Sequence, residues 1–218
     1  MENNKIIKRE FYQRNTQKVA KDLLGKKIVR NIIKNDNTIF KLSGFIVETE
    51  AYGFKNDKSS HAYNGITKRN QVMFGQVGRS YVYFTYGNHY CFNIVSYGCD
   101  VKAGAVLIRA IEPIEGIEVM KKNRKIENIH SLASGPGKLT QAFQINNQHN
   151  DLDLTYLNNE IHVEEGIVPD GICVTKRIGI KNDVYKFWRF IMMNKHIDGM
   201  KINKHVSRKK ENSNYIFN

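Results

Sequence analysis

Two glutamates separated by one residue are the first candidates for chemistry in this sequence. Glu48 and Glu50 lie in IVETEAY, at residues 46–52, where an apolar run ends. Side chains alternate along an extended strand, so the two carboxyl groups and the ring of Tyr52 are expected on one face. Two carboxylates held this close raise the pKa of one of them, which produces a general base that works near neutral pH. The alternative is that both glutamates form salt bridges with the abundant lysines, and this segment alone favours that alternative.

An aromatic segment supplies a second group of candidates. SYVYFTYGNHYCFNIV, at residues 80–95, contains two β-favouring runs around Gly87 and Asn88, a pair suited to a tight hairpin turn. Tyr86 is expected at the hairpin tip, where it cannot easily belong to a core and could act as a wedge between stacked bases. The other rings can form an ordinary aromatic sheet core or a stacking platform for a nucleobase.

The charge of the chain favours a polyanionic partner. Lys and Arg number 34 against 21 Asp and Glu, which gives a formal charge of +13. Binding to phosphates releases their counterions, and this release drives association with a basic surface. A solvated basic surface that binds nothing in particular is the competing explanation.

Several other polar residues carry weaker signals. His61 lies in a polar loop, where a single histidine is usually structural. Arg109 lies in the apolar segment VLIRAIEP, and a buried guanidinium there needs a partner such as Glu112. SGPGKL, at residues 134–139, offers backbone N–H groups at a helix start, a good place for a phosphate or carboxylate, but it lacks the pattern of a nucleotide-binding P-loop. The seven histidines and three cysteines show no metal-ligand spacing, so neither a metal nor a cofactor is expected.

Alternating strands and helices must position these side chains. The residue patterns predict helices at residues 10–24, 114–125 and 134–145, and Thr16 is a candidate cap within the first of them. Strands are predicted at residues 25–33, 38–52, 80–95, 104–113, 160–166 and 171–180. Residues 53–78 are polar and contain several glycines, which is typical of a functional loop. The alternation favours a mixed α/β single domain at residues 1–200, followed by a basic, flexible tail at 201–218.

The sequence also indicates a compartment. Its start lacks the apolar core of a secretory signal, and no apolar run approaches the roughly 20 residues that span a bilayer. An odd number of cysteines without C-x-x-C spacing argues against a disulfide framework. We therefore expect a cytoplasmic protein with no membrane attachment.

The motifs together resemble the alkyladenine (3-methyladenine) DNA glycosylase family. The resemblance runs in order from about residue 8 to about residue 190, and it is carried by LLGKKIVR, GFIVETEAY, SSHAYNGITKRNQVMFGQVGRSYVYFTYGNHYCFNIV, AVLIRAIEP and SGPGKLTQA. The C-terminal part of this stretch also retains Arg177, Gly179, Arg189 and Phe190. The stretch from ETEAY through YVYFTYG is long and specific to the family.

The resemblance implies a fold and a reaction. The fold is an α+β single domain with a curved antiparallel β-sheet, flanking helices and a protruding β-hairpin. The reaction belongs to base excision repair: a monofunctional glycosylase flips alkylated or deaminated purines out of double-stranded DNA and hydrolyses the N-glycosidic bond with an activated water, leaving an abasic site. The resemblance further implies a monomer in a bacterial-type cytoplasm, associated with the nucleoid, without cofactor or metal.

The resemblance also assigns roles in the hydrolysis. Glu50 matches the general base that deprotonates the attacking water, and Arg109 matches the arginine that helps to hold the water and the adjacent phosphate. Glu48 is then a structural partner on the same face. Hydrolysis of an N-glycosidic bond needs a base and a negative charge near an oxocarbenium-like sugar, and Glu50 can provide both.

The remaining matches concern the damaged base. Tyr52, His61 and Tyr83 match residues that enclose the flipped base. Asn93 matches a pocket-floor residue that discriminates against the exocyclic amino group of guanine, and Tyr86 matches the hairpin residue that fills the gap in the duplex. A damaged base costs less to unstack and flip, which adds selectivity before any pocket contact.

Two other functions fit parts of the same pattern. A non-catalytic nucleic-acid-binding module would use the basic and aromatic surface but would not need Glu50. A glycosidase of free nucleosides would have no use for Tyr86 or for the large positive charge, and its activity would depend less steeply on salt.

Overall fold

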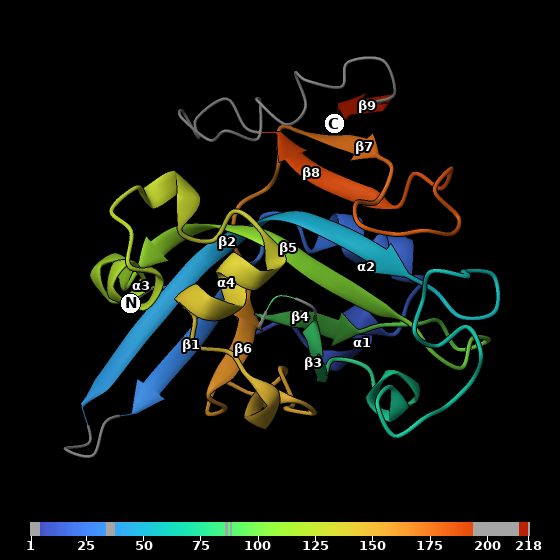
Figure 1. Ribbon diagram of the computed structural model, residues 1–218, viewed down its shortest axis with the longest axis horizontal. Coiled ribbons are helices and arrows are strands. Elements are labelled where there is room, and N and C mark those ends of the chain that lie inside the picture. The colour runs from blue at the N-terminus through green and yellow to red at the C-terminus, as the bar shows by residue number, and fades with distance from the viewer. Residues whose placement is uncertain (1–4, 34–37, 86, 88, 194–213, 218) are drawn as a thin grey trace.

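The computed structural model describes residues 5–33, 38–85, 87, 89–193 and 214–217 (Figure 1). Within these residues nine strands form one curled antiparallel sheet with helices packed against it. The predicted α+β single domain with a curved sheet is therefore confirmed. Two predicted features lie outside the described residues: Tyr86, expected at the hairpin tip, and all of the predicted tail at 201–218 except residues 214–217.

The elements follow the predicted segments closely. The strands are β1 (Lys27–Ile33), β2 (Ile39–Tyr52), β3 (Ser80–Thr85), β4 (His89–Val95), β5 (Ala105–Glu115), β6 (Ile161–Glu164), β7 (Gly171–Thr175), β8 (Arg189–Met193) and β9 (Asn214–Phe217). The α-helices are α1 (Arg9–Tyr12), α2 (Thr16–Asp22), α3 (Ile117–Arg124) and α4 (Pro136–Ala142). Single 3-10 turns are η1 (Gln71–Phe74), η2 (Ile129–Ser131) and η3 (Asn147–His149).

Two local predictions need correction. The cap of α2 is Asn15 and not Thr16: the Oδ1 atom of Asn15 accepts hydrogen bonds from two backbone N–H groups of the first turn, at 3.0 and 3.2 Å. The Thr16 hydroxyl instead donates to the carbonyl of Ser96 at 2.7 Å, so it joins α2 to a distant segment. The predicted strand at residues 171–180 ends at Thr175, where the chain leaves the sheet before it returns as β8.

The long strand β2 organises the sheet, whose order is β3-β4-β5-β2-β8-β7-β9. One edge of β2 pairs with β5, whereas the other edge pairs first with β1, through residues 39–45, and then with β8, through residues 48–50. The pairing with β5 contains register shifts on either side of Glu48. Such bulges bend a strand and increase its twist, which lets one edge serve two neighbours and sets Glu50 opposite Arg189.

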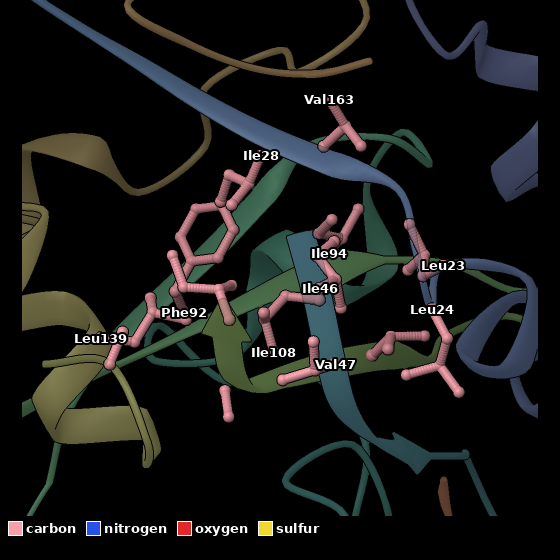
Figure 2. Packing of buried hydrophobic residues seen from close by; sticks show 14 of the residues in the cluster. Leu23, Leu24, Ile28, Ile46, Val47, Phe92, Ile94, Ile108, Leu139 and Val163 are labelled. Atoms are coloured by element: carbon pink, nitrogen blue, oxygen red, sulfur yellow. The ribbon is translucent and has the colours of Figure 1, made fainter. Parts of the chain in front are cut away.

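A large apolar cluster holds the sheet and α2 together (Figure 2). Leu23 and Leu24 follow α2, Ile46 and Val47 belong to β2, and Ile108 belongs to β5; all five are at most 2% exposed. Complete burial of a Leu or Ile side chain stabilises a fold by about 1.5–3 kcal/mol, so this cluster fixes β2 against the helix.

The position of Thr49 in β2 shows which way the glutamates point. The Thr49 hydroxyl donates to the carbonyl of Ala20 in α2 at 2.7 Å, so this position faces the helix. Because side chains alternate along a strand, Glu48 and Glu50 point to the opposite side. The helix therefore covers one face of β2 and leaves the other to the two carboxylates.

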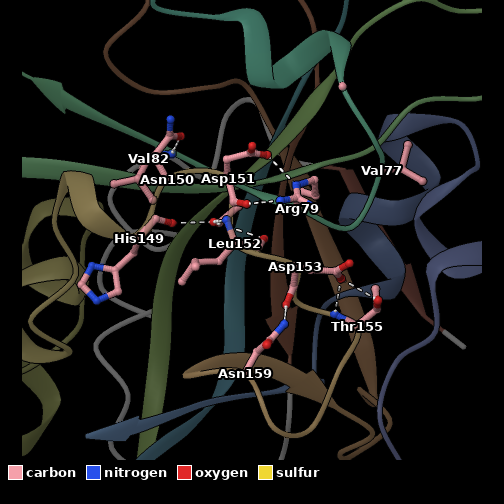
Figure 3. Close-up of polar contacts among 12 residues, drawn as sticks. Val77, Arg79, Val82, His149, Asn150, Asp151, Leu152, Asp153, Thr155 and Asn159 are labelled. Atoms are coloured by element: carbon pink, nitrogen blue, oxygen red, sulfur yellow. Dashed lines mark hydrogen bonds and ion pairs between the residues drawn. The ribbon is translucent and has the colours of Figure 1, made fainter.

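Side chains cap the open edge of β3 (Figure 3). Arg79 donates to the carboxylate and to the carbonyl oxygen of Asp151, at 2.5 and 2.6 Å. The Oδ1 atom of Asn150 accepts from the backbone N–H of Val82 at 2.9 Å. Covering an edge in this way prevents pairing with other chains and holds β3, which carries two tyrosines of the site, in place.

A smaller apolar cluster anchors the loop at residues 53–78. Ala62 and Met73 of the loop are buried against Tyr81 of β3. The short 3-10 turn η1 lies within this loop. This packing positions His61, the residue just before Ala62, over the sheet.

Candidate active site

Glu50 is completely buried, and a donor reaches each of its carboxylate oxygens. Oε1 accepts from the backbone N–H of Ile178 at 2.8 Å, and Oε2 accepts from the Tyr52 hydroxyl at 2.9 Å. The guanidinium of Arg109 lies 3.3 Å from Oε2. These contacts replace the water that a buried carboxylate loses. The expectation that Glu50 and Tyr52 share a face is confirmed by their direct contact.

Arg109, on β5, joins the two glutamates. Its Nε donates to Oε1 of Glu48 at 2.6 Å, while its Nη1 makes the ion pair with Glu50. Burial acts to lower the pKa of Arg109, but the two carboxylates outweigh burial and raise it, so the guanidinium stays charged. Arg109 does form a buried ion pair, but its partners are Glu48 and Glu50 and not Glu112, the partner suggested from the sequence, because a residue three positions further along a strand points to the opposite face.

Glu48 is shared by two arginines. Its Oε1 accepts from Nε of Arg109 and from Nε of Arg189, both at 2.6 Å. Burial acts to raise the pKa of Glu48, but the two guanidinium groups hold this carboxyl below its usual value. The charges beside both glutamates therefore come from arginines of β5 and β8, and not from the lysines that the alternative required.

Burial also determines the protonation state of the Tyr52 hydroxyl. Burial and then the Glu50 carboxylate raise the pKa of this phenol well above its usual value. The hydroxyl stays protonated at neutral pH and remains a hydrogen-bond donor to Glu50.

Aromatic rings from β3 and the 53–78 loop form a group of their own. The Nδ1 atom of His61 lies 2.9 Å from the hydroxyl of Tyr81, and its ring centroid lies 4.6 Å from that of Tyr83, at an interplanar angle of 69°. Burial, and then the nearby Arg69, lower the pKa of His61, so its imidazole is neutral at neutral pH. Tyr81 and Tyr83, two positions apart along β3, share one face of the strand, because both rings contact His61.

Asn93 lies in β4 directly opposite Tyr81 and is 3% exposed. Its Nδ2 donates to the carbonyl of Tyr81 at 2.9 Å. That bond fixes the side-chain amide beside the aromatic group. Asn93 also pairs with Leu107 of β5, two residues before Arg109, so the hairpin is tied to the strand that carries the arginine.

The structure adds residues that sequence patterns did not single out for chemistry. Arg177 forms two parallel hydrogen bonds with Asp57, both at 2.7 Å, and Arg189 contacts Glu48. Both arginines lie in the stretch that carries the family resemblance, so a signal was present. The partners of these arginines could not be found from the sequence, because Asp57 lies 120 positions from Arg177 and Glu48 lies 141 positions from Arg189.

Two further findings concern the described part of the chain. No group of three or more His, Cys, Asp or Glu side chains there is arranged to hold a metal ion. No helix among those residues is long and apolar enough to cross a bilayer.

Comparison with known proteins agrees with the motifs. A family model described as Methylpurine-DNA glycosylase (MPG) matches residues 10–196. The chain belongs to this family. Membership confirms the predicted resemblance and the predicted enzyme class, since DNA glycosylases are hydrolases.

Three relatives illustrate the extent of the similarity. The chain is 47% identical over 180 residues to a protein of Chlorobium phaeobacteroides (strain BS1), which covers 83% of this chain and 88% of that protein. Identity is 45% over 206 residues to a protein of Carboxydothermus hydrogenoformans, with coverages of 94% and 100%. It is 48% over 176 residues to a protein of Francisella tularensis subsp. tularensis (strain SCHU S4 / Schu 4), with coverages of 78% and 87%. All three carry the name "Putative 3-methyladenine DNA glycosylase".

Proposed function

We propose that this glycosylase removes alkylated or deaminated purines from double-stranded DNA during base excision repair. The nucleotide is flipped out of the duplex, a water hydrolyses the N-glycosidic bond, and an abasic site remains. One observation carries the proposal: the buried Glu50 carboxylate, with Ile178 and Tyr52 as donors and Arg109 as its counter-charge. The names of the relatives support an alkylated purine as the substrate.

Glu50 acts as the general base. A carboxylate oxygen can accept two hydrogen bonds, so Oε1, which takes one from Ile178, can take a second from a water. Transfer of a proton from that water to Glu50 lets the water oxygen bond to the sugar carbon as the base departs. The negative charge also stabilises the oxocarbenium-like transition state, while Arg109 holds the water and the adjacent phosphate.

Aromatic rings receive the flipped base. Tyr52, His61 and Tyr83 enclose it, and Asn93 lies at the floor, where its amide opposes the exocyclic amino group of guanine. Aromatic faces attract cations, so these rings favour a base that methylation has made positively charged. Such a base is also a good leaving group, whereas a neutral deaminated purine must be protonated first.

The rest of the molecule serves the encounter with DNA. Tyr86, which lies in the sequence between β3 and β4, fills the gap that the flipped nucleotide leaves. The formal charge of +13 attracts the phosphate backbone. The attacking group is a water and not a lysine amine, so the enzyme is monofunctional and leaves the DNA strand intact. We propose that it acts as a monomer in the cytoplasm, at the nucleoid.

Base release from duplex oligonucleotides tests the proposal. One substrate carries a single hypoxanthine and the other is methylated DNA, and abasic sites are revealed with alkali. Glu50→Gln should bind both duplexes and release no base. Glu165→Gln is the matched control, because Glu165 is half exposed and pairs with Lys26 away from the site; it should behave as the wild type does.

The same assay separates the alternatives. If the wild type binds DNA and releases no base from either substrate, the chain is a binding module and the proposal fails. If it releases bases from free nucleosides but not from duplexes, it is a nucleoside glycosidase. Release by Glu50→Gln at the wild-type rate would remove Glu50 from the mechanism.

A further inference from the structure

A completely buried ion pair joins two loops beside Glu50. Asp57 belongs to the loop that follows β2, and Arg177 belongs to the segment between β7 and β8. Nη1 and Nη2 of Arg177 each donate to one oxygen of Asp57 at 2.7 Å, and both side chains are 0% exposed. Two parallel hydrogen bonds fix the plane of a guanidinium as well as its position.

That plane packs on the ring of Tyr52. The guanidinium carbon of Arg177 lies 4.7 Å from the centroid of the Tyr52 ring and 5.1 Å from that of Trp188. Nη1 also donates to the carbonyl of Ala51 at 3.0 Å, so the arginine is hydrogen-bonded to the backbone on the N-terminal side of Tyr52. The hydroxyl of the same tyrosine donates to Oε2 of Glu50.

The other oxygen of Glu50 depends on the next residue in the chain. Ile178 follows Arg177 directly, and its backbone N–H donates to Oε1 of Glu50 at 2.8 Å. Arg177 thus reaches one carboxylate oxygen through Tyr52 and the other through Ile178. It touches neither oxygen itself.

Asp57, the partner of Arg177, is itself fixed by hydrogen bonds from the backbone. Its two oxygens accept from the backbone N–H groups of Gly53, at 3.0 Å, and of Ser59, at 3.2 Å. Gly53 follows Tyr52, so the carboxylate also fixes the backbone on the C-terminal side of the tyrosine. Further bonds between the two loops run from the backbone N–H of Lys58 to Asp183, at 2.7 Å, and from the hydroxyl of Ser59 to the Asn182 carbonyl, at 2.6 Å.

Stability alone does not account for this arrangement. A buried ion pair pays a desolvation penalty that its attraction often only balances, so apolar side chains of similar volume would hold the loops as well. Apolar side chains could not fix the orientation of Tyr52 and of the Ile178 amide at once. We propose that Asp57 and Arg177 are positioning residues for base release, which fix both oxygens of Glu50 so that Oε1 is oriented toward the water; this rests on the proposed role of Glu50.

Single-turnover base release separates positioning from binding. Asp57→Asn keeps the shape and removes the charge, and Arg177→Lys keeps the charge and removes the planar pair of bonds. Misplacement of a catalytic group by about 1 Å costs about 100-fold in rate, so each variant should release a base about 10- to 100-fold more slowly. The affinity for duplex DNA with an uncleavable abasic analogue should change less than about twofold. Asp153→Asn is the matched control, because it breaks a partly buried ion pair with Arg9 of α1 that contains none of the residues assigned to the site.

Two readouts distinguish positioning from folding. Trp188 is the only tryptophan in the chain, so its fluorescence reports directly on the stack with Arg177 and should change in both variants. Arg177→Ala should regain base release when ethylguanidinium is added, whereas a merely structural defect would not respond. If Arg177→Ala does not fold, the rate of base release by Asp57→Asn, compared with that of Asp153→Asn, decides whether the ion pair has a positioning role.

The outcomes also separate this inference from the proposed function. A wild type that releases no base refutes the proposed function itself. If the wild type is active and Glu50→Gln is not, but Asp57→Asn and Arg177→Lys release bases at the rate of Asp153→Asn, only the positioning role is refuted.

Discussion

Replacing Glu48 with Gln removes the negative charge that two buried arginines share. The side chain of Glu48 is 13% exposed, and those of Arg109 and Arg189 are 12% and 9% exposed. Removing one partner of a buried ion pair costs about 3–5 kcal/mol, because the other charge is left uncompensated. Gln keeps the shape and can still accept one of the hydrogen bonds. We therefore expect the free energy of unfolding of Glu48→Gln to fall by about 3 kcal/mol, at the low end of that range.

Urea unfolding at pH 7 measures this loss. For a chain of this size, about 3 kcal/mol corresponds to a fall of about 6–12 °C in Tm, which thermal unfolding can check independently. Glu165→Gln is again the control, because Glu165 pairs with Lys26 at the surface and exposed pairs contribute only about 0–1 kcal/mol.

The pH dependence provides a second check. The folded-state pKa of Glu48 lies below its unfolded value, so the charge stabilises the folded protein above about pH 4.3. The contribution is lost as the pH falls through the folded-state pKa. The difference in stability between the wild type and Glu48→Gln should accordingly stay nearly constant from pH 7 to about pH 5 and shrink only below about pH 4.3, as the pH falls toward the folded-state pKa. Two results would refute the reasoning: a stability difference below about 1 kcal/mol at pH 7, or a difference that does not shrink as the pH falls below about 4.3.

Two further predictions concern the site. Tyr52→Phe removes the hydroxyl that donates to Glu50, a hydrogen bond to a charged group worth about 1.5–3 kcal/mol, so single-turnover base release should slow by at least about tenfold. Tyr97→Phe, whose hydroxyl donates to the Gly75 carbonyl instead, should keep the wild-type rate, and equal rates for the two variants would contradict the role of Tyr52. His61 has a lowered pKa in the folded state, so the stability that it contributes is present above its unfolded pKa of about 6.5 and declines as the pH falls through the folded value. His61→Asn should therefore lose less stability than the wild type when the pH falls from 7.5 to 5. Urea unfolding at both pH values measures this loss, and equal losses in the wild type and in His61→Asn would contradict the lowered pKa of His61.

Much of the fold could be predicted from the sequence, because its signals are local. Period-2 alternation marked β2, and two β-favouring runs marked the hairpin of β3 and β4. Gly87, with a φ of 88°, lies where a tight hairpin turn was expected. Local patterns failed where a short apolar run carries no distinguishing period. RFIMM, which forms β8, was not predicted to be a strand, and it is specified mainly by its pairing with β2 and β7.

Alternation along a strand was enough to predict from the sequence that Glu48, Glu50 and Tyr52 share one face. The partners of these side chains depend on the fold, which brings distant segments together. Arg109 pairs with the two glutamates and not with nearby Glu112, because strand geometry turns Glu112 to the other face. Spacing along a chain specifies contacts only within an element, whereas the donors that hold Glu50 come from loops and strands that the curled sheet brings together.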